Sequence, residues 1–149
     1  MDIRFWNQEI ETLAQKDLRQ LQLTRLRELI GYAMKTPFYH KRLKKAGISS
    51  PEDIQDLEDL QKIPFTVKDD LRQAFPKGLL AVDMEQVVRI HSSSGTTGIP
   101  TVIYYTAKDL DRWTDLLARG IVATGAGPAD VFQNMMSYGL FTGGLGLHY

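Results

Sequence analysis

Residues 92–101 read SSSGTTGIPT, a stretch rich in hydroxyl groups and glycine that offers almost nothing to bury. Apolar, β-branched runs flank it at residues 87–90 and 101–105, and both favour β-strands. The stretch is therefore expected to be a loop between two strands. It differs from the P-loop of nucleoside triphosphatases, because it lacks Gly-Lys-Ser/Thr and a strand follows it.

Two interpretations of this loop remain open from composition. Its successive backbone N–H groups could form a concave nest for an anion, and Gly95 and Gly98 would let a phosphate approach closely. The alternative is a solvent-facing hairpin loop that binds nothing. Residues alone do not separate the two.

Residues 1–86 are predicted to be helical. One buried helix face follows the 3.6-residue period through Leu26, Leu29, Ile30, Ala33 and Met34. Pro37 interrupts this helix, and a second helix is expected over residues 38–46, with Gly47 as its C-terminal cap. Helix starts are predicted at residues 50–53 and 66–69, the latter helix ending before Pro76.

The second predicted helix carries a basic cluster, composed of Lys41, Arg42, Lys44 and Lys45. Cations near a helix C-terminus offset the helix dipole, which favours a solvated face. An anion-binding role is the alternative.

After residue 86 the pattern becomes mixed. Residues 106–109 form a capping signal, and residues 107–124 predict an amphipathic helix that Gly125 ends. One side of this helix carries Leu110, Trp113, Leu116 and Leu117. Residues 130–136 are predicted to be a buried strand. The fold class is therefore α/β, with an N-terminal helical region at residues 1–86 and an α/β region at residues 87–149.

Composition excludes several classes of protein. The 149 residues include 18 Lys plus Arg and 18 Asp plus Glu, so no net field favours nucleic acid or an anionic membrane. There is no cysteine, which excludes disulfides and thiolate metal sites in this stretch. No signal peptide and no membrane span is recognised. We expect a soluble, cytoplasmic protein that binds neither nucleic acid nor membrane.

Longer stretches carry a family resemblance. SSSGTTGIPT resembles the phosphate-binding signature of the adenylate-forming acyl-CoA synthetase superfamily. RIHSSSGTTGIPTVIYYT, IPFTVKDDLRQAFPKGL and YGLFTGGLGLHY resemble the phenylacetate–CoA ligase family, and KTPFYHKRLKKAGI is similar to its N-terminal helical region. The resemblance extends along essentially the whole chain.

The resemblance implies an AMP-forming ligase that uses ATP, Mg²⁺ and coenzyme A. Such enzymes join a carboxylic acid to ATP as an acyl-adenylate and then transfer the acyl group to coenzyme A. The β- and γ-phosphates are expected to contact Ser93, Ser94, Gly95, Thr96, Thr97 and Gly98. Two departures weaken this expectation. Many relatives have lysine where this chain has Ile99, and many superfamily members have lysine where it has Thr101, although Thr101 is in keeping with the phenylacetate–CoA ligase variant.

The C-terminal segment YGLFTGGLGLHY reads, from residues alone, as a glycine-rich turn into a helix with aromatic core residues. The resemblance implies instead that it lines the aryl-acid pocket, through Tyr138, Phe141, Gly143 and Gly144. His40, His91 and His148 are interpreted as hydrogen-bonded structural histidines, although His91 could contact the loop.

Members of the family are much longer than this chain, so the chain is expected to be an N-terminal, truncated part. No catalytic residue and no metal ligand is assigned within it, and alone it is expected to be inactive. The alternatives to a ligase part are a non-catalytic nucleotide-binding module and an interaction module. A truncated core should leave apolar surface exposed, which favours association, so a homodimer is also expected.

Overall fold

The computed structural model describes residues 5–93, 100–140 and 142–148. The chain forms two compact units. One consists of Leu13–Asp83, and the other combines the described residues of 1–12 with those of 84–149. Each unit is described by itself below.

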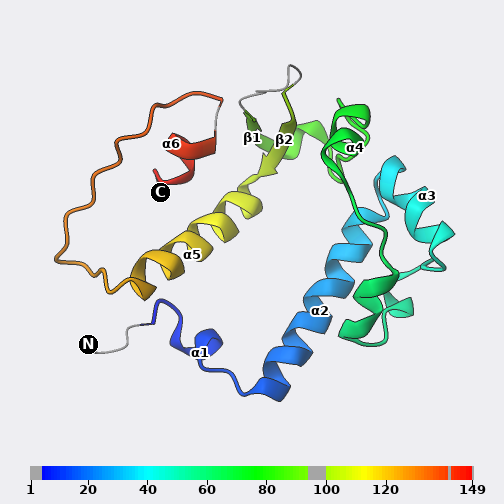
Figure 1. Cartoon of the computed structure of the whole chain (residues 1–149), viewed down its shortest axis with the longest axis horizontal. Helices are drawn as coiled ribbons and strands as arrows, with labels where there is room; N and C mark the ends of the chain where they lie inside the picture. Colours follow the sequence, from blue (N-terminus) through cyan, green and yellow to red (C-terminus); the bar gives the residue numbers. More distant parts are fainter. Residues whose placement is uncertain (1–4, 94–99, 141, 149) are drawn as a thin grey trace. The chain divides into compact units, whose positions relative to one another are not determined.

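The Leu13–Asp83 unit is helical (Figure 1). Its helices are α2 (Gln15–Ala33), α3 (Pro37–Lys45) and α4 (Lys68–Gln73), with short 3₁₀ turns η1 (Pro51–Asp53) and η2 (Leu57–Lys62) between the last two. The core is small and consists of Ile30, Leu43, Ile48 and Ile54. Leu23, Leu26 and Ala33 from α2 pack against it, as does Met34, the residue that follows this helix.

The boundaries around α3 follow local chemistry and confirm the prediction. The Thr36 hydroxyl accepts a hydrogen bond from the Tyr39 N–H at 3.2 Å, and Pro37 occupies the first helical position. The helix ends before Gly47, whose φ of +81° favours glycine.

Two details of the helical prediction are wrong. Leu29 is 63% exposed, because it lies at the margin of the apolar stripe and Leu23 takes its place in the core contacts. The cap of the helix predicted from residues 66–69 lies one residue later: Val67 is the N-cap, its N–H donates to Asp70 at 3.0 Å, and the helix begins at Lys68. The Thr66 hydroxyl instead bonds the Tyr39 hydroxyl at 2.7 Å.

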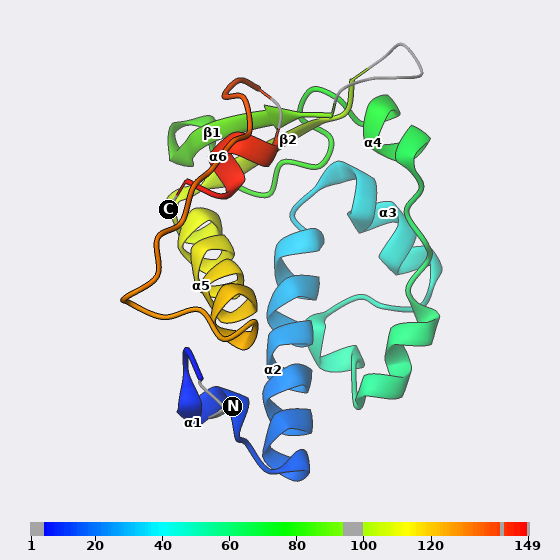
Figure 2. The ribbon, with the colours of Figure 1, turned by 60° about the vertical axis from the view of Figure 1, so that its left-hand side comes forward.

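The second unit contains a β-hairpin and helices (Figure 2). Strand β1 (Val87–Ser92) pairs antiparallel with β2 (Val102–Thr106), and His91 faces Ile103 in the register. The two strands predicted on either side of the Ser/Thr/Gly stretch are confirmed, whereas residues 94–99 between them lie outside the described residues. Helix α5 (Ala107–Ala123) follows β2 directly, and α6 (Thr142–Gly146) lies near the C-terminus.

Helix α5 begins and ends as predicted. The Thr106 hydroxyl accepts from the Asp109 N–H at 3.2 Å, and the Asp109 carboxylate accepts from the Thr106 N–H at 2.9 Å, which is a capping box. Gly125, with φ +95°, follows its end. The short helix α1 (Gln8–Glu11) joins this unit, since Trp6 Nε1 donates to Asp115 of α5 at 2.8 Å.

The predicted buried strand at residues 130–136 is wrong. This segment is extended without pairing, and Val131 and Met135 are 98% and 85% exposed. A strand needs a neighbour for its backbone hydrogen bonds, and the only sheet among the described residues is the β1–β2 hairpin. No helix in the described part of the chain is long and apolar enough to cross a membrane.

Candidate functional site

A reciprocal pair of hydrogen bonds joins Ser93 and Thr101, at the two ends of the Ser/Thr/Gly stretch. The Ser93 N–H donates to the Thr101 carbonyl oxygen at 2.9 Å, and the Thr101 N–H donates to Ser93 Oγ at 2.9 Å. Ser93 is the one predicted phosphate-binding residue among those described. Ser94, Gly95, Thr96, Thr97 and Gly98 lie outside the described residues, as does Ile99.

Thr101 occupies a buried position, with 5% of its surface exposed. Its hydroxyl oxygen has no hydrogen-bond partner among the described residues. A lysine at this position, as in many superfamily members, would place a charge where little water reaches, which is costly without a partner. Threonine therefore suits this buried position better than lysine would.

His91 lies on β1 just before the loop and is buried, with 1% of its surface exposed. Its ring packs edge-on against Tyr105 and Trp113, at centroid distances of 5.1 and 5.6 Å. Neither ring nitrogen has a hydrogen-bond partner among the described residues. Burial, and secondarily the charge of Arg89, lower the pKa of His91. The imidazole is therefore neutral at pH 7, although it is not the hydrogen-bonded histidine that we expected.

A closed space of about 10 Å³ adjoins His91 and is bounded by α5 and α6. That volume is about the size of one water molecule. Its lining residues are Arg89, His91, Leu110, Trp113, Thr114, Leu145 and Gly146. A space of this size cannot hold a substrate.

The segment between α5 and α6 contacts the end of β1. The Ser92 N–H donates to the Leu140 carbonyl oxygen at 2.8 Å. The two sequence motifs singled out above, SSSGTTG and YGLFTGGLG, therefore meet at the end of β1. Phe141, predicted to line the acid pocket, lies outside the described residues.

A polar network surrounds Tyr138. Its hydroxyl lies 3.1 Å from His148 Nδ1 and 3.4 Å from Asn134 Nδ2. Asn134 Nδ2 also donates to the Gly144 carbonyl oxygen at 2.9 Å, and Asn134 Oδ1 accepts from the Met136 N–H at 3.0 Å. His148 is exposed and hydrogen-bonded to Tyr138.

The predicted glycines Gly143 and Gly144 both lie in α6. Gly144 is buried, and a Cβ built there would meet the Ser137 carbonyl oxygen at 2.5 Å. Close backbone packing therefore requires glycine at this position, independently of any ligand. Sequence reasoning missed Asn134, because two adjacent amides, Gln133 and Asn134, within an apolar run give no periodic signal.

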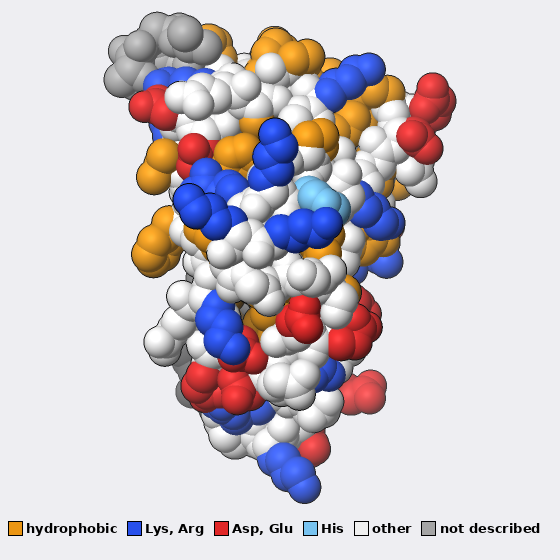
Figure 3. Space-filling model, turned by 90° about the vertical axis from the view of Figure 1, so that its right-hand side faces the viewer, with side chains coloured by type: hydrophobic (Ala, Val, Ile, Leu, Met, Phe, Trp, Pro, Cys, Tyr) orange, Lys and Arg blue, Asp and Glu red, His pale blue; other side chains and the backbone are white. Residues whose placement is uncertain are grey.

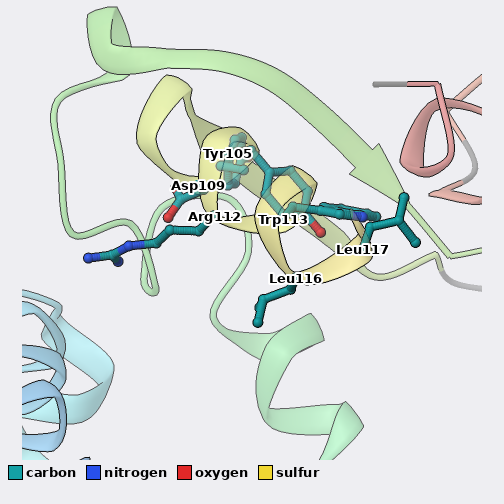
Figure 4. Close-up of a pocket in the computed structure, with 7 residues that line it drawn as sticks. Tyr105, Asp109, Arg112, Trp113, Leu116 and Leu117 are labelled. Atoms are coloured by element: carbon teal, nitrogen blue, oxygen red, sulfur yellow. The ribbon is translucent and has the colours of Figure 1, made fainter. Parts of the chain in front are cut away.

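An open hollow of about 620 Å³ lies beside β2 and α5 (Figure 4). Its lining residues are Tyr104, Tyr105, Asp109, Arg112, Trp113, Leu116 and Leu117. Leu116 is 61% exposed, so the apolar side predicted for this helix is only partly covered among the described residues. None of the predicted site residues that the structure describes lines this hollow.

Basic side chains gather on the face that carries α3 (Figure 3). Lys41, Lys44 and Lys45 are exposed there. Arg42 is used internally, since it pairs with Asp70 at 3.1 Å and donates to the Phe65 carbonyl oxygen at 2.6 Å. This arrangement matches a solvated helix face. His40, also on α3, is exposed and its Nδ1 lies 3.1 Å from the Met34 carbonyl oxygen.

Sequence comparison identifies close relatives. The chain is 50% identical over 141 residues to the phenylacetate–coenzyme A ligase of Thermus thermophilus, which covers 94% of this chain and 32% of that protein. It is 48% identical over 141 residues to the phenylacetate–coenzyme A ligase of Escherichia coli K12, with the same coverage. No protein-family model matches the chain.

Solved structures agree. The crystal structure of 2-hydroxyisobutyryl-CoA ligase with 2-HIB-AMP superposes with a TM-score of 0.84 at 27% identity, covering 97% of this chain and 31% of that one. The complex of the same ligase with 2-HIB-AMP and CoA gives a TM-score of 0.84 at 28% identity. The predicted resemblance and fold class are confirmed: the chain has the fold of the N-terminal part of an adenylate-forming CoA ligase. It spans about a third of the length of the curated relatives it matches.

Proposed function

We propose that this chain is the N-terminal part of an ATP-dependent aryl-acid CoA ligase that acts on phenylacetate. In the first step the acid's carboxylate attacks the α-phosphorus of ATP, giving an acyl-adenylate and releasing pyrophosphate. In the second step the coenzyme A thiol attacks the acyl carbon, giving a thioester and releasing AMP. The proposal rests on 48–50% identity over 141 residues to four phenylacetate–coenzyme A ligases.

The phosphate site in this proposal comprises Ser93, Ser94, Gly95, Thr96, Thr97 and Gly98. The hydrogen bond between Ser93 and Thr101 supports this assignment. Ser93 Oγ accepts from the Thr101 N–H, so the hydroxyl proton of Ser93 is still available to donate to a phosphate. The Thr101 hydroxyl, which is buried and has no partner among the described residues, is a further polar group next to Ser93. Such prearranged donors cost no reorganisation when phosphate charge must be stabilised.

Mg²⁺ belongs to the proposal as a partner of the phosphates. When bound, it would neutralise phosphate charge and be held by phosphate oxygens and water. The described residues contain no group of three or more His, Asp or Glu that could hold an ion.

The aryl acid is proposed to lie against Tyr138 and Phe141, next to Gly143 and Gly144. The Tyr138 side chain is exposed, with 56% of its surface accessible. Its hydroxyl, at the edge of the ring, is hydrogen-bonded to His148 and leaves the ring face uncovered by that contact. An anchored aromatic ring presents a planar apolar surface at little entropic cost. The Ser92–Leu140 hydrogen bond joins this segment to the phosphate loop.

The chain's contribution to catalysis in this proposal is positioning. Holding the carboxylate in line with the α-phosphorus converts an encounter between two substrates into a reaction within one complex. We assign no general acid or base to the described residues, and we propose that the 149 residues alone are inactive. A cytoplasmic location, where ATP and coenzyme A are available, and a homodimer complete the proposal.

The proposal is tested with a hybrid enzyme, in which this chain replaces the matching residues of the Thermus thermophilus ligase. ATP–pyrophosphate exchange reports adenylate formation without coenzyme A. We expect exchange that depends on phenylacetate. A hybrid that melts cooperatively but shows no acid-dependent exchange, while the unaltered Thermus enzyme does, would contradict the proposal.

A further inference from the structure

Asn134 lies in the extended segment between α5 and α6, outside every site predicted from the sequence. Its carboxamide makes contacts in two directions. Oδ1 accepts from the Met136 N–H at 3.0 Å within the segment, and Nδ2 donates to the Gly144 carbonyl oxygen of α6 at 2.9 Å. Nδ2 also lies 3.4 Å from the Tyr138 hydroxyl. One side chain thus connects the extended segment, α6 and the aromatic ring.

These partners fix the orientation of the amide. The Met136 N–H can only donate, so it must face Oδ1, and the Gly144 carbonyl can only accept, so it must face Nδ2. Aspartate has the same size but offers only acceptors when ionised. Leucine offers neither function, and glutamine is one methylene longer. The position therefore selects asparagine by both length and polarity.

The direction of these bonds extends to Tyr138. Asn134 Nδ2 donates toward the Tyr138 oxygen, and the same hydroxyl group shares a hydrogen bond with His148 Nδ1, 3.1 Å away. The Tyr138 and His148 rings also meet edge-to-face, with centroids 5.6 Å apart. The tyrosine ring is thus held at its hydroxyl from two sides.

We infer that Asn134 is a positioning residue for the aryl acid, acting by fixing the Tyr138 ring and the Gly144 backbone against which the acid binds. The inference rests on the proposed function, since it requires the acid to lie at Tyr138. Asn134 itself touches the network and not the acid, so its removal should loosen acid binding without altering the phosphate site.

The test uses the hybrid enzyme described above with Asn134→Asp. This substitution keeps the acceptor for Met136 but turns an ionised oxygen toward the Gly144 carbonyl. We expect the KM for phenylacetate to rise about tenfold, the size of one lost hydrogen bond, with the KM for ATP within about twofold. Gln133→Glu makes the same amide-to-carboxylate change at the exposed neighbouring residue, and it should alter neither KM.

A second variant separates positioning from general stability. Tyr138→Phe keeps the ring but removes the hydroxyl that Asn134 and His148 hold. If Asn134 acts through this hydroxyl, the double variant should be no worse for the acid's KM than the worse single variant. Fully additive effects, or an unchanged acid KM in Asn134→Asp, would overturn the inference.

If Asn134→Asp yields no folded hybrid, Tyr138→Phe alone decides, and an unchanged acid KM there would overturn the inference. A folded, unsubstituted hybrid without acid-dependent activity would overturn the proposed function and this inference together. That failure is recognisable because it precedes any substitution.

Discussion

The backbone N–H of Ser92 donates a 2.8 Å hydrogen bond to the carbonyl oxygen of Leu140. This contact joins the end of β1, where the Ser/Thr/Gly loop begins, to the segment that leads into α6. In the proposed reaction the carboxylate and the α-phosphate must meet in line, so the two motifs need a fixed separation. A backbone bond between them supplies that constraint without depending on side chains.

Amide hydrogen exchange in the 149-residue chain tests this contact. We predict that the Ser92 N–H exchanges at least about tenfold more slowly than in an unstructured peptide, since it is held between elements distant in sequence. Ser93, whose N–H donates to Thr101, is the internal reference. Exchange of Ser92 at the unprotected rate, with Ser93 protected, would show that the contact does not persist in solution.

The buried His91 should make folding stability depend on pH. Burial holds its pKa below the ordinary value of 6.5 in the folded chain, whereas the unfolded chain regains that value. The unfolded state therefore binds more protons below about pH 6.5, so this contribution is complete above that pH and declines as the pH falls.

Urea unfolding at pH 7.5 and 5.5 measures the effect. His91→Phe, which keeps the ring contacts with Tyr105 and Trp113, should lose less stability on acidification than the wild type. His40→Gln changes an exposed histidine and should behave as the wild type does. Equal pH dependence in wild type and His91→Phe would contradict the account.

The Thr101 hydroxyl gives a further prediction. Thr101→Val keeps the shape and removes a buried oxygen that has no partner among the described residues. In the 149-residue chain we expect stability to be unchanged or raised by up to about 1 kcal/mol, measured by urea unfolding. A loss of stability greater than about 1 kcal/mol would show that the hydroxyl has a partner in the folded chain.

Close packing at Gly144 predicts a large effect from a small change. Gly144→Ala would place a methyl group 2.5 Å from the Ser137 carbonyl oxygen, so backbone must move, at a cost of about 1–3 kcal/mol. Gly139→Ala is the matched control, because a Cβ there meets nothing within 4 Å. Melting temperatures distinguish the two, and equal values would contradict the packing seen at α6.

Local features of the fold were predictable because they depend on neighbours in sequence. Thr106 and Asp109 define the start of α5 by contacts three residues apart, and Gly47 ends α3 through its own φ angle. The strand expected at residues 130–136 was wrong because pairing depends on a partner elsewhere, which apolar composition cannot reveal.

The candidate site was only partly predictable for the same reason. The motifs SSSGTTG and YGLFTGGLG stand out by their composition, and the resemblance to the phenylacetate–CoA ligase family implied a function for each. Nothing in the sequence indicated that Asn134 bonds Gly144, or that residues 5–12 join the α5 unit through Trp6 and Asp115. Such contacts depend on how distant segments fold back on one another.

The most direct test of the account is thioester formation by the hybrid enzyme that carries this chain in place of the matching part of the Thermus thermophilus ligase. With phenylacetate, ATP, Mg²⁺ and coenzyme A, the account predicts phenylacetyl-CoA and AMP from the hybrid, and none from the 149-residue chain alone. A cooperatively folded hybrid that makes no thioester from phenylacetate, or thioester made by the 149 residues alone, would contradict it.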